Sequence, residues 1–281
     1  MRPTLLSKTA MMFALLVCLL NQPSAKAQNT DVRNPILTSK FVVGLGVFSP
    51  SQVIRLGANG STVNDEIDFG KAFDLKSRSY RPNVYLMWRF FNRWRLYGEY
   101  FSFDKSNERK LDEDLHWQDY TLKAGTYVKG GLGLDVYRAL VGYALMDKTN
   151  QNLIIGIGAH TLGIRPHLEG EATINDQTVH YKNKNTNFVA PLPNIILRYT
   201  YAINDKWSLS GKIDWLAINL GDYGGGIWDV GPSVQFQAFR HFSVNLDYRY
   251  FKIYGDVNRE RWNGSFFLEF KGPTLSINAN F

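Results

Sequence analysis

Apolar and polar residues alternate with a period of two over stretches of eight to ten residues, and this feature constrains the fold most strongly. A period of two is typical of a β-strand whose two faces meet different surroundings. The length matches a tilted strand that crosses a membrane. The chain ends on this pattern, with the following residues on one face of the last strand: Leu275, Ile277, Ala279 and Phe281.

The first 27 residues have the three parts of a secretory signal peptide. Arg2 and Lys8 make a basic start, "TAMMFALLVCLL" is the apolar part, and "AKA" at 25–27 is a small-x-small cleavage site. Cys18, the only cysteine, lies in this segment. We therefore expect a mature chain without disulfides, cysteine nucleophiles or thiolate metal sites. We expect residues 28–38 to form an N-terminal segment and residues 39–281 the folded domain.

The composition of the mature chain favours a membrane barrel. Removal of the signal leaves a net charge of +4, which is too mild to indicate nucleic-acid binding. Aromatic residues make up 14% of the chain, and amphipathic rings collect at membrane–water interfaces. No run of 18 apolar residues follows the signal, so helical spans are excluded. A membrane-spanning chain of this kind can only be a closed barrel.

Short and long connections alternate along the chain, as periplasmic turns and surface loops do in outer-membrane barrels. The short turns lie at 91–94, 146–152, 203–207 and 239–242. We predict a transmembrane antiparallel up-and-down β-barrel of about ten strands, with an extra hairpin in the first long loop. A bulge at Gly272 and Pro273 is expected to reverse the outward face of the last strand. The strands are predicted at 39–56, 79–91, 94–107, 129–145, 152–168, 187–203, 207–220, 226–239, 242–256 and 263–281.

This pattern resembles the Gram-negative outer-membrane β-barrels. Their last strand commonly ends in Phe, is read by the barrel-assembly machinery, and pairs with the first strand to close the ring. The resemblance implies these roles for the four residues from Leu275 to Phe281, and an outer-membrane location after export through the periplasm. A soluble barrel or sandwich with a buried apolar face is the competing interpretation.

If the apolar residues face lipid, the opposite face lines the lumen. A ten-stranded barrel encloses little space, so these charges are expected to pair. The favoured hypothesis is a salt-bridged plug, and the alternative is a narrow polar conduit. The predicted lumen-lining residues are Arg89, Arg95, Glu99, Arg138, Arg198, Lys212, Asp214, Asp229, Asp247, Arg249, Glu269 and Lys271.

The best acid–base cluster lies in "LDEDLHWQD" at 111–119, within a predicted surface loop. It suggests a comparison with the omptins, ten-stranded outer-membrane proteases whose chemistry needs two acidic residues facing an Asp–x–His unit. The match to that pattern is poor, and a solvated acidic loop is the favoured interpretation. His160 is expected to point inward as a hydrogen-bonded filler. The scattered histidines do not have metal-ligand spacing, so no metal site or cofactor is predicted.

Basic residues near the predicted outer rim suit the phosphate groups of lipopolysaccharide. We predict a monomeric, non-catalytic envelope protein that contacts outer-membrane lipid and lipopolysaccharide and binds no nucleic acid. The alternatives are a surface-exposed enzyme of the protease or lipid-modifying type and a loop-based adhesin or ligand-binding barrel. The basic rim residues are Arg55, Lys105, Arg109, Lys110, Lys182, Lys184, Arg259 and Arg261.

Overall fold

A computed structural model describes residues 33–59, 66–75, 80–117, 120–174, 177–182, 188–221, 223–259 and 262–281. The predicted signal peptide and the segment 28–32 lie outside these residues. No helix among the described residues is both long and apolar enough to span a membrane.

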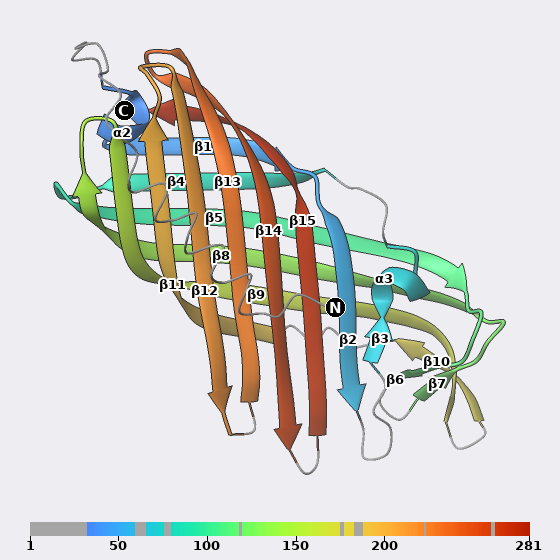
Figure 1. Ribbon diagram of the computed structural model, residues 1–281. Coiled ribbons are helices and arrows are strands. Elements are labelled where there is room, and N and C mark those ends of the chain that lie inside the picture. The colour runs from blue at the N-terminus through green and yellow to red at the C-terminus, as the bar shows by residue number, and fades with distance from the viewer. Residues whose placement is uncertain are drawn as a thin grey trace, which may run out of the picture. The chain divides into compact units, whose positions relative to one another are not determined.

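The strands form one antiparallel ring, shown in Figure 1, which confirms the predicted barrel of about ten strands. β1 and β2 follow each other along the first strand position, so eleven strand segments make ten positions. Their observed bounds agree with the predicted ranges to within a few residues at most ends. The segments are β1 (Phe41–Phe48), β2 (Ser51–Asn59), β4 (Arg81–Arg89), β5 (Trp94–Lys110), β8 (Tyr127–Asp147), β9 (Gln151–Ile174), β11 (Phe188–Ala202), β12 (Trp207–Leu220), β13 (Tyr223–Phe239), β14 (Phe242–Arg259) and β15 (Trp262–Asn280).

The last strand closes the ring against the first. β15 pairs with β1 in register from Phe48 opposite Thr274 to Val42 opposite Asn280. The closure continues to the terminal residue, because the Phe281 N–H donates to the Phe41 carbonyl at 2.8 Å and the Phe41 N–H donates back at 2.8 Å. The C-terminal stripe is therefore held by main-chain hydrogen bonds on both sides of β15.

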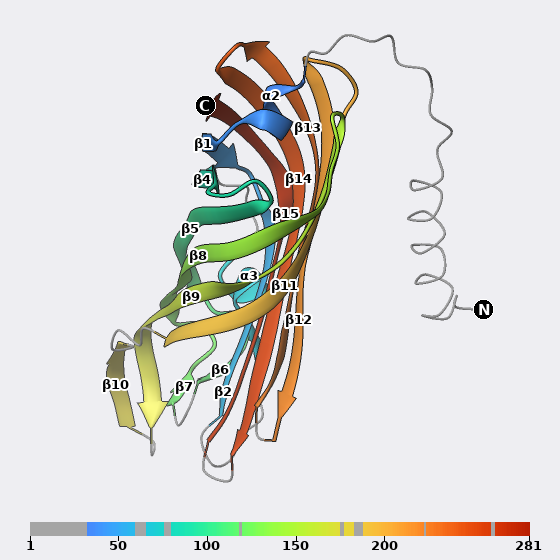
Figure 2. The same cartoon turned by 90° about the vertical axis from the view of Figure 1, so that its left-hand side faces the viewer.

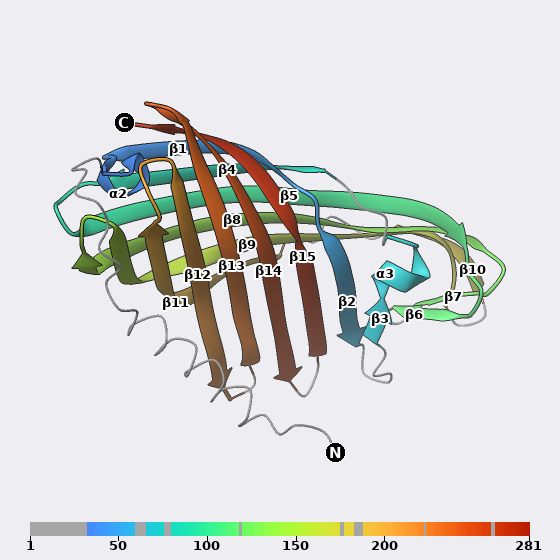
Figure 3. The same ribbon diagram turned by 45° about the horizontal axis from the view of Figure 1, so that its top comes forward.

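The two ends of the ring differ (Figures 1, 2 and 3). The chain terminus and α2 (Pro35–Thr38) lie at one end, with the short turns. The opposite end carries α3 (Phe69–Ala72), β3 (Glu66–Asp68), β6 (Leu115–Trp117), β7 (Tyr120–Leu122) and β10 (Gln177–Lys182). β2 pairs with β3, which confirms the predicted extra hairpin in the first long loop. Outer-membrane barrels have short turns at the periplasmic end and long loops at the outer end. The α2 end, which has the short turns, is therefore the periplasmic end, and the α3 end is the outer end.

The apolar face of each strand changes sides between the two ends. Near the periplasmic end the apolar residues point outward, and Leu275 and Ile277 of β15 are 56% and 61% exposed. Toward the outer end the inward residues are apolar, so Leu268 and Phe270 of the same strand are fully buried. These join an apolar core that also contains Phe69 and Phe73 from the first long loop. β15 therefore has a lower half whose apolar residues face outward and an upper half whose apolar residues join a core, as in a soluble protein.

The predicted bulge at Gly272 and Pro273 is wrong. β14 pairs with β15 in one unbroken register from Arg259 opposite Trp262 to Phe242 opposite Ala279. The apolar residues of β15 switch from odd, outward positions to even, inward positions because the surroundings of the strand change. Beyond the membrane, its outer face contacts water and its inner face contacts an apolar core. Glu269 and Lys271 therefore lie on the outer surface, where their side chains bond each other at 3.2 Å, and they do not line the lumen as predicted.

Candidate functional site

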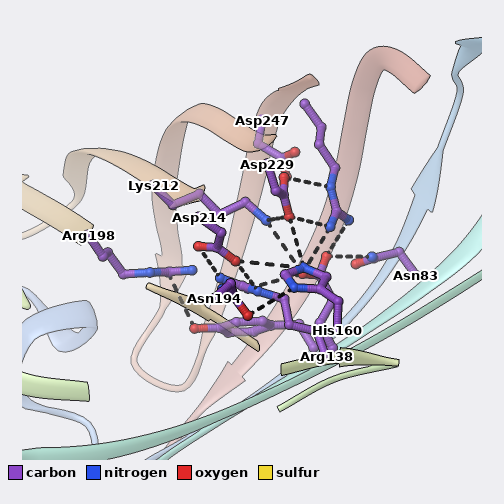
Figure 4. A network of polar contacts seen from close by, with 12 residues as sticks. Asn83, Arg138, His160, Asn194, Arg198, Lys212, Asp214, Asp229 and Asp247 are labelled. Carbon is purple, nitrogen blue, oxygen red and sulfur yellow. Dashed lines mark hydrogen bonds and ion pairs between the residues drawn. The ribbon is translucent and has the colours of Figure 1, made fainter. Parts of the chain in front are cut away.

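A network of buried charges crosses the middle of the barrel interior between the periplasmic end and the apolar core (Figure 4). Its side chains come from six strand positions, so it links parts of the wall that are not neighbours. The outward neighbours of these residues are lipid-facing, which leaves each charged side chain on the inward face of its strand. Four anions and four cations make the group neutral, and six of them form ion pairs with one another: Glu99, Asp214 and Asp229 with Arg138, Lys212 and Arg249. The other two, Asp247 and Arg198, lie beside these six and form no ion pair with them among the described residues.

Glu99 on β5 is the hub of the network. Its carboxylate accepts hydrogen bonds from Arg138 at 3.2 Å, from Arg249 at 2.7 Å and from Lys212 at 3.4 Å. Asn83 on β4 adds a fourth donor at 3.0 Å. Glu99 thus connects β4, β5, β8, β12 and β14 through one side chain, and only 9% of that side chain is exposed.

Two arginines each hold one further aspartate with two hydrogen bonds. Arg138 donates from Nε and a terminal nitrogen to Asp214 at 2.5 and 2.8 Å. Arg249 donates likewise to Asp229 at 3.0 and 2.5 Å, and Lys212 approaches Asp229 at 3.1 Å. Paired, two-point contacts of this kind are the strong form of the ion pair. They suit charges that would be costly to bury alone.

His160 on β9 points inward, as predicted, and lies beside both aspartates. Its Nδ1 is 3.2 Å from the Asn194 side-chain oxygen, while its Nε2 is buried without a hydrogen-bond partner. Nε2 lies 3.8 Å from Asp214 and 3.9 Å from Asp229. These three residues have donor atoms close enough together for a metal ion. However, both carboxylates are already bound by guanidinium groups, so a divalent ion would add charge to a neutral, buried group.

Arg198 on β11 contacts aromatic rings, whereas Arg138 and Arg249 bind carboxylates. Its guanidinium lies over the rings of Tyr97 and Tyr85, at 4.9 and 5.7 Å from their centroids. It also donates to the Tyr85 hydroxyl at 3.5 Å. The expected ion pair between Arg198 and a carboxylate is not found among the described residues, so its charge is stabilised mainly by the two aromatic faces.

The periplasmic end of the interior is covered by α2. The Asn34 side chain donates to the Asn204 carbonyl at 3.0 Å, and Arg89 donates to the Leu37 carbonyl. Nearby, Arg95 forms an ion pair with Asp147 at 3.2 Å. Between α2 and the charge network lies a cavity of about 100 Å³ that is lined mainly by polar side chains.

The structure places ten of the twelve predicted lumen residues inward and gathers eight of them into the network, with Arg89 and Arg95 near α2. Sequence reasoning missed Asn83 and Tyr85, which are partners of Glu99 and Arg198, and Asn194, which is the partner of His160. The alternation along the strands places these three residues on the inward face, and this could have identified them from the sequence. Their uncharged side chains did not stand out among the other polar residues of the inward face.

The acidic loop is not assembled as an acid–base site in the part that the structure describes. Arg109 pairs with Asp112 at 2.8 Å, and Lys123 pairs with Asp114 at 3.1 Å, all on the surface. Asp114 and His116 have the Asp–x–His spacing. The expectation that the sequence lacks the Asp–x–His unit of the omptin pattern is therefore wrong. Asp119 and the side chain of His116 lie outside the described residues.

The predicted basic rim residues do not form one cluster. Lys105 reaches the Leu75 carbonyl at 3.0 Å, and Lys182 pairs with Glu169 at 3.1 Å. The hydrogen bond from Lys182 lowers the pKa of Glu169, and His180 acts in the same direction. Arg55 lies over the ring of Phe267, at 4.1 Å from its centroid. Lys184, Arg261 and the side chain of Arg259 lie outside the described residues.

Comparison with known proteins gives structural relatives. The chain is similar to the outer membrane protease OmpT from Escherichia coli, with a TM-score of 0.52 and 7% identity, over 85% of this chain and 97% of OmpT. It also matches the translocator domain of autotransporter NalP from Neisseria meningitidis, with a TM-score of 0.41 and 9% identity, over 98% of both chains. Neisserial surface protein A matches with a TM-score of 0.33 and 9% identity, over 86% of this chain and 98% of that protein.

No protein-family model matches the sequence, and no curated protein matches it. At these identities the likeness concerns the fold alone. The chain has the fold of the Gram-negative outer-membrane β-barrels.

Proposed function

We propose that the chain is a non-catalytic outer-membrane β-barrel whose interior is closed to solutes. Its first 27 residues serve as a cleaved export signal, and β15 is read by the barrel-assembly machinery. The single observation that carries the proposal is the buried charge network, because Glu99 alone connects three cations from different parts of the wall. Such a network fills the interior where an open pore would hold water.

Two further layers support closure. Below the network, α2 covers the periplasmic end through Asn34 and Leu37. Above it, aromatic side chains pack face to edge across the interior, with Phe101 and Phe251 at 5.6 Å and Phe103 and Phe270 at 5.3 Å. A polar solute would have to displace paired charges and then cross an apolar core. Both steps cost free energy that a dedicated pore avoids.

A solute-efflux experiment tests the proposal. The protein is refolded into vesicles loaded with a small sugar, and release is compared with that from empty vesicles and from vesicles containing a known porin. The expected result is release at the rate of the empty vesicles. Release at a rate near that of the porin would refute closure and favour a conduit. A variant without residues 33–38 should remain closed, because the network lies above α2.

A further inference from the structure

A polar pocket of about 440 Å³ lies at the periplasmic end of the ring, between α2 and the turn that joins β8 to β9. Pockets of roughly 300–1,000 Å³ are typical of sites for small ligands. The pocket shares no lining residue with the interior cavity between α2 and the charge network, so it is a separate space. We call it the periplasmic pocket.

The lining of the periplasmic pocket has more positive than negative charge. Three cations line it: Arg33, Arg89 and Lys148. None of the three forms an ion pair in the part of the chain that the structure describes. One described lining residue is acidic, Asp147, and both its oxygens are already used, because Arg95 donates to one at 3.2 Å and Asn152 to the other at 3.0 Å. Arg95 balances Asp147, so three positive charges remain at the pocket.

Arg89 has hydrogen-bonding capacity that its own neighbours do not use. It follows the lipid-facing Trp88 on β4, so its side chain points to the inner side of the wall. One terminal nitrogen donates to the Leu37 carbonyl, while Nε is buried without an acceptor among the described residues. A buried donor without a partner costs free energy. An oxyanion in the pocket would give this guanidinium an acceptor.

Both walls of the pocket are held by hydrogen bonds within the protein. At α2, the Asn34 side chain accepts from the Ile36 N–H at 3.1 Å and donates to the Asn204 carbonyl at 3.0 Å. At the turn, the Lys148 N–H donates to the Gln151 carbonyl at 2.9 Å. The lining cations therefore start from fixed main-chain positions, so less conformational freedom is lost when a ligand binds.

The surroundings of the pocket are also positive. Each of the four short turns carries one Lys or Arg, and the N-terminal segment and the strand ends add four more. Against these eight cations stand three carboxylates, so five positive charges remain, or four when Asp31, which precedes the described residues, is added. An excess of this size attracts anions from the periplasm. The cations are Arg33, Lys40, Arg89, Arg93, Arg95, Lys148, Lys206 and Arg240, and the carboxylates are those of Asp147, Asp205 and the terminal Phe281.

We propose that the periplasmic pocket binds an acidic peptide through its carboxylate groups. Arg33 pairs with the ligand from the side of α2, and Lys148 pairs with it from the side of the turn. The Arg89 guanidinium suits the two oxygens of a carboxylate, because its nitrogens can donate to both. The proposal goes beyond closure of the interior, because the pocket lies outside the charge network.

The uncharged groups of the pocket favour a peptide over an inorganic anion. The hydroxyls of Thr38 and Thr149 and the amide of Asn150 can each donate and accept hydrogen bonds. A peptide main chain offers both donors and acceptors to such groups. The inward position of Arg89 argues against a lipid headgroup, because lipid contacts the outward face of the strands.

Binding of a fluorescent peptide to the folded protein in detergent, followed by anisotropy, tests this proposal. The probe is Ala-Glu-Ala-Glu, and the matched neutral probe has Gln in place of Glu and an amidated end. The variant Arg33→Gln/Lys148→Gln should bind the acidic probe about tenfold more weakly, at roughly threefold for each exposed ion pair. Arg240→Gln removes an exposed cation from the turn between β13 and β14. It should bind as the wild type does at about 150 mM salt, which screens charges outside the pocket.

The proposal would be overturned by equal binding of the acidic probe to the double variant and the wild type, or by equal binding of the neutral probe. Full competition by inorganic phosphate at the concentration of the probe would instead assign the pocket to a free anion. An equal loss for Arg240→Gln would assign the binding to the general charge of this end. Either result would also overturn the proposal.

A second variant covers a failure of the double variant to fold. If the double variant does not show the heat-modifiable mobility of a folded barrel, Lys148→Gln alone decides. It should bind the acidic probe roughly threefold more weakly. Unchanged binding of this variant would contradict the role of the pocket. Peptide binding and closure of the interior are separate measurements, so each can fail alone.

Discussion

Arg138 on β8 reaches across the barrel interior to Asp214 on β12, which is three strand positions away in the ring, and binds it with two hydrogen bonds of 2.5 and 2.8 Å. Neither side chain is more than 2% exposed. The same guanidinium also contacts Glu99 at 3.2 Å on the adjacent strand β5. One side chain thus ties together two parts of the wall that share no main-chain hydrogen bonds.

Replacing Arg138 by methionine should destabilise the barrel strongly. The substitution leaves Asp214 buried without its two-point partner, and loss of one member of a buried ion pair costs about 3–5 kcal/mol. The measurement is the free energy of unfolding by urea in lipid vesicles.

Arg198→Met is the matched control for this variant, because it removes the same kind of side chain from the same interior. Arg198 is stabilised by the rings of Tyr85 and Tyr97 rather than by a close carboxylate. Its loss should cost clearly less, about 1–2 kcal/mol, which is the worth of desolvated cation–π contacts. An equal or larger loss for Arg198→Met would contradict the assignment of the ion pairs.

The change of apolar face along β15 predicts opposite effects at adjacent positions. Phe270→Lys puts a charge into the apolar core of the outer half and should lower the free energy of unfolding by several kcal/mol. Glu269→Lys changes a residue of the outer surface and should be tolerated. Folding yields and unfolding curves of both variants check this pair. If Glu269→Lys lowered the stability more than Phe270→Lys, Glu269 would have to point into the barrel, as the predicted bulge at Gly272 and Pro273 requires.

Strand positions were predictable because alternation acts locally, and each strand carries its own signal. Which residues point inward and which point outward was predictable only for the part of each strand that lies within the membrane. For β15, the same alternation supports two interpretations: a bulge with a constant environment, or a straight strand whose environment changes. Nothing in the sequence states where the hydrocarbon ends, so Glu269 and Lys271 were assigned to the wrong face.

The partners of the charges could not be predicted from the sequence. Inward residues are known from the alternation, yet which ones meet depends on the curvature and closure of the ring. Arg138 and Asp214 are 76 residues apart, and Glu99 and Arg249 are 150 apart. Arg198 shows the limit most clearly, because its charge alone suggested a carboxylate partner while its neighbours are Tyr85 and Tyr97.

Gly130 on β8 leaves room for Phe73 of the first long loop, because it has no side chain. A Cβ at this position would lie 2.2–2.4 Å from the ring of Phe73, which follows α3. Gly130→Val should therefore displace Phe73 and cost about 1–3 kcal/mol, as overpacking does. Limited trypsin digestion should then cut faster at the exposed Lys71 of α3.

Gly211→Ala is the control for the glycine variant, because an added Cβ there meets no atom within 4 Å. It should digest at the wild-type rate and keep the wild-type stability. If Gly130→Val leaves cleavage at Lys71 unchanged, the loop is not held by the contact between Phe73 and Gly130.

Removal of Phe281 should slow assembly. Its main chain exchanges hydrogen bonds with Phe41, and its ring stacks on His241 at 5.6 Å. Deleting it shortens the closing pair, and Phe281→Asp adds a charge at the membrane interface. Heat-modifiable electrophoretic mobility and the outer-membrane yield measure the effect, with Phe281→Tyr as the control. Normal folding of both changed chains would contradict a role of the terminal residue in closure.

Ion conductance across a planar bilayer tests closure of the interior most directly, because ions detect a narrower path than sugars do. In the wild-type barrel the three anions Glu99, Asp214 and Asp229 and the three cations Arg138, Lys212 and Arg249 form one neutral, close-contact group, so negligible conductance is expected. Arg138→Met should show small, salt-sensitive currents that prefer cations, because an unpaired carboxylate attracts them. Large and steady channels in the wild type would contradict the closed interior.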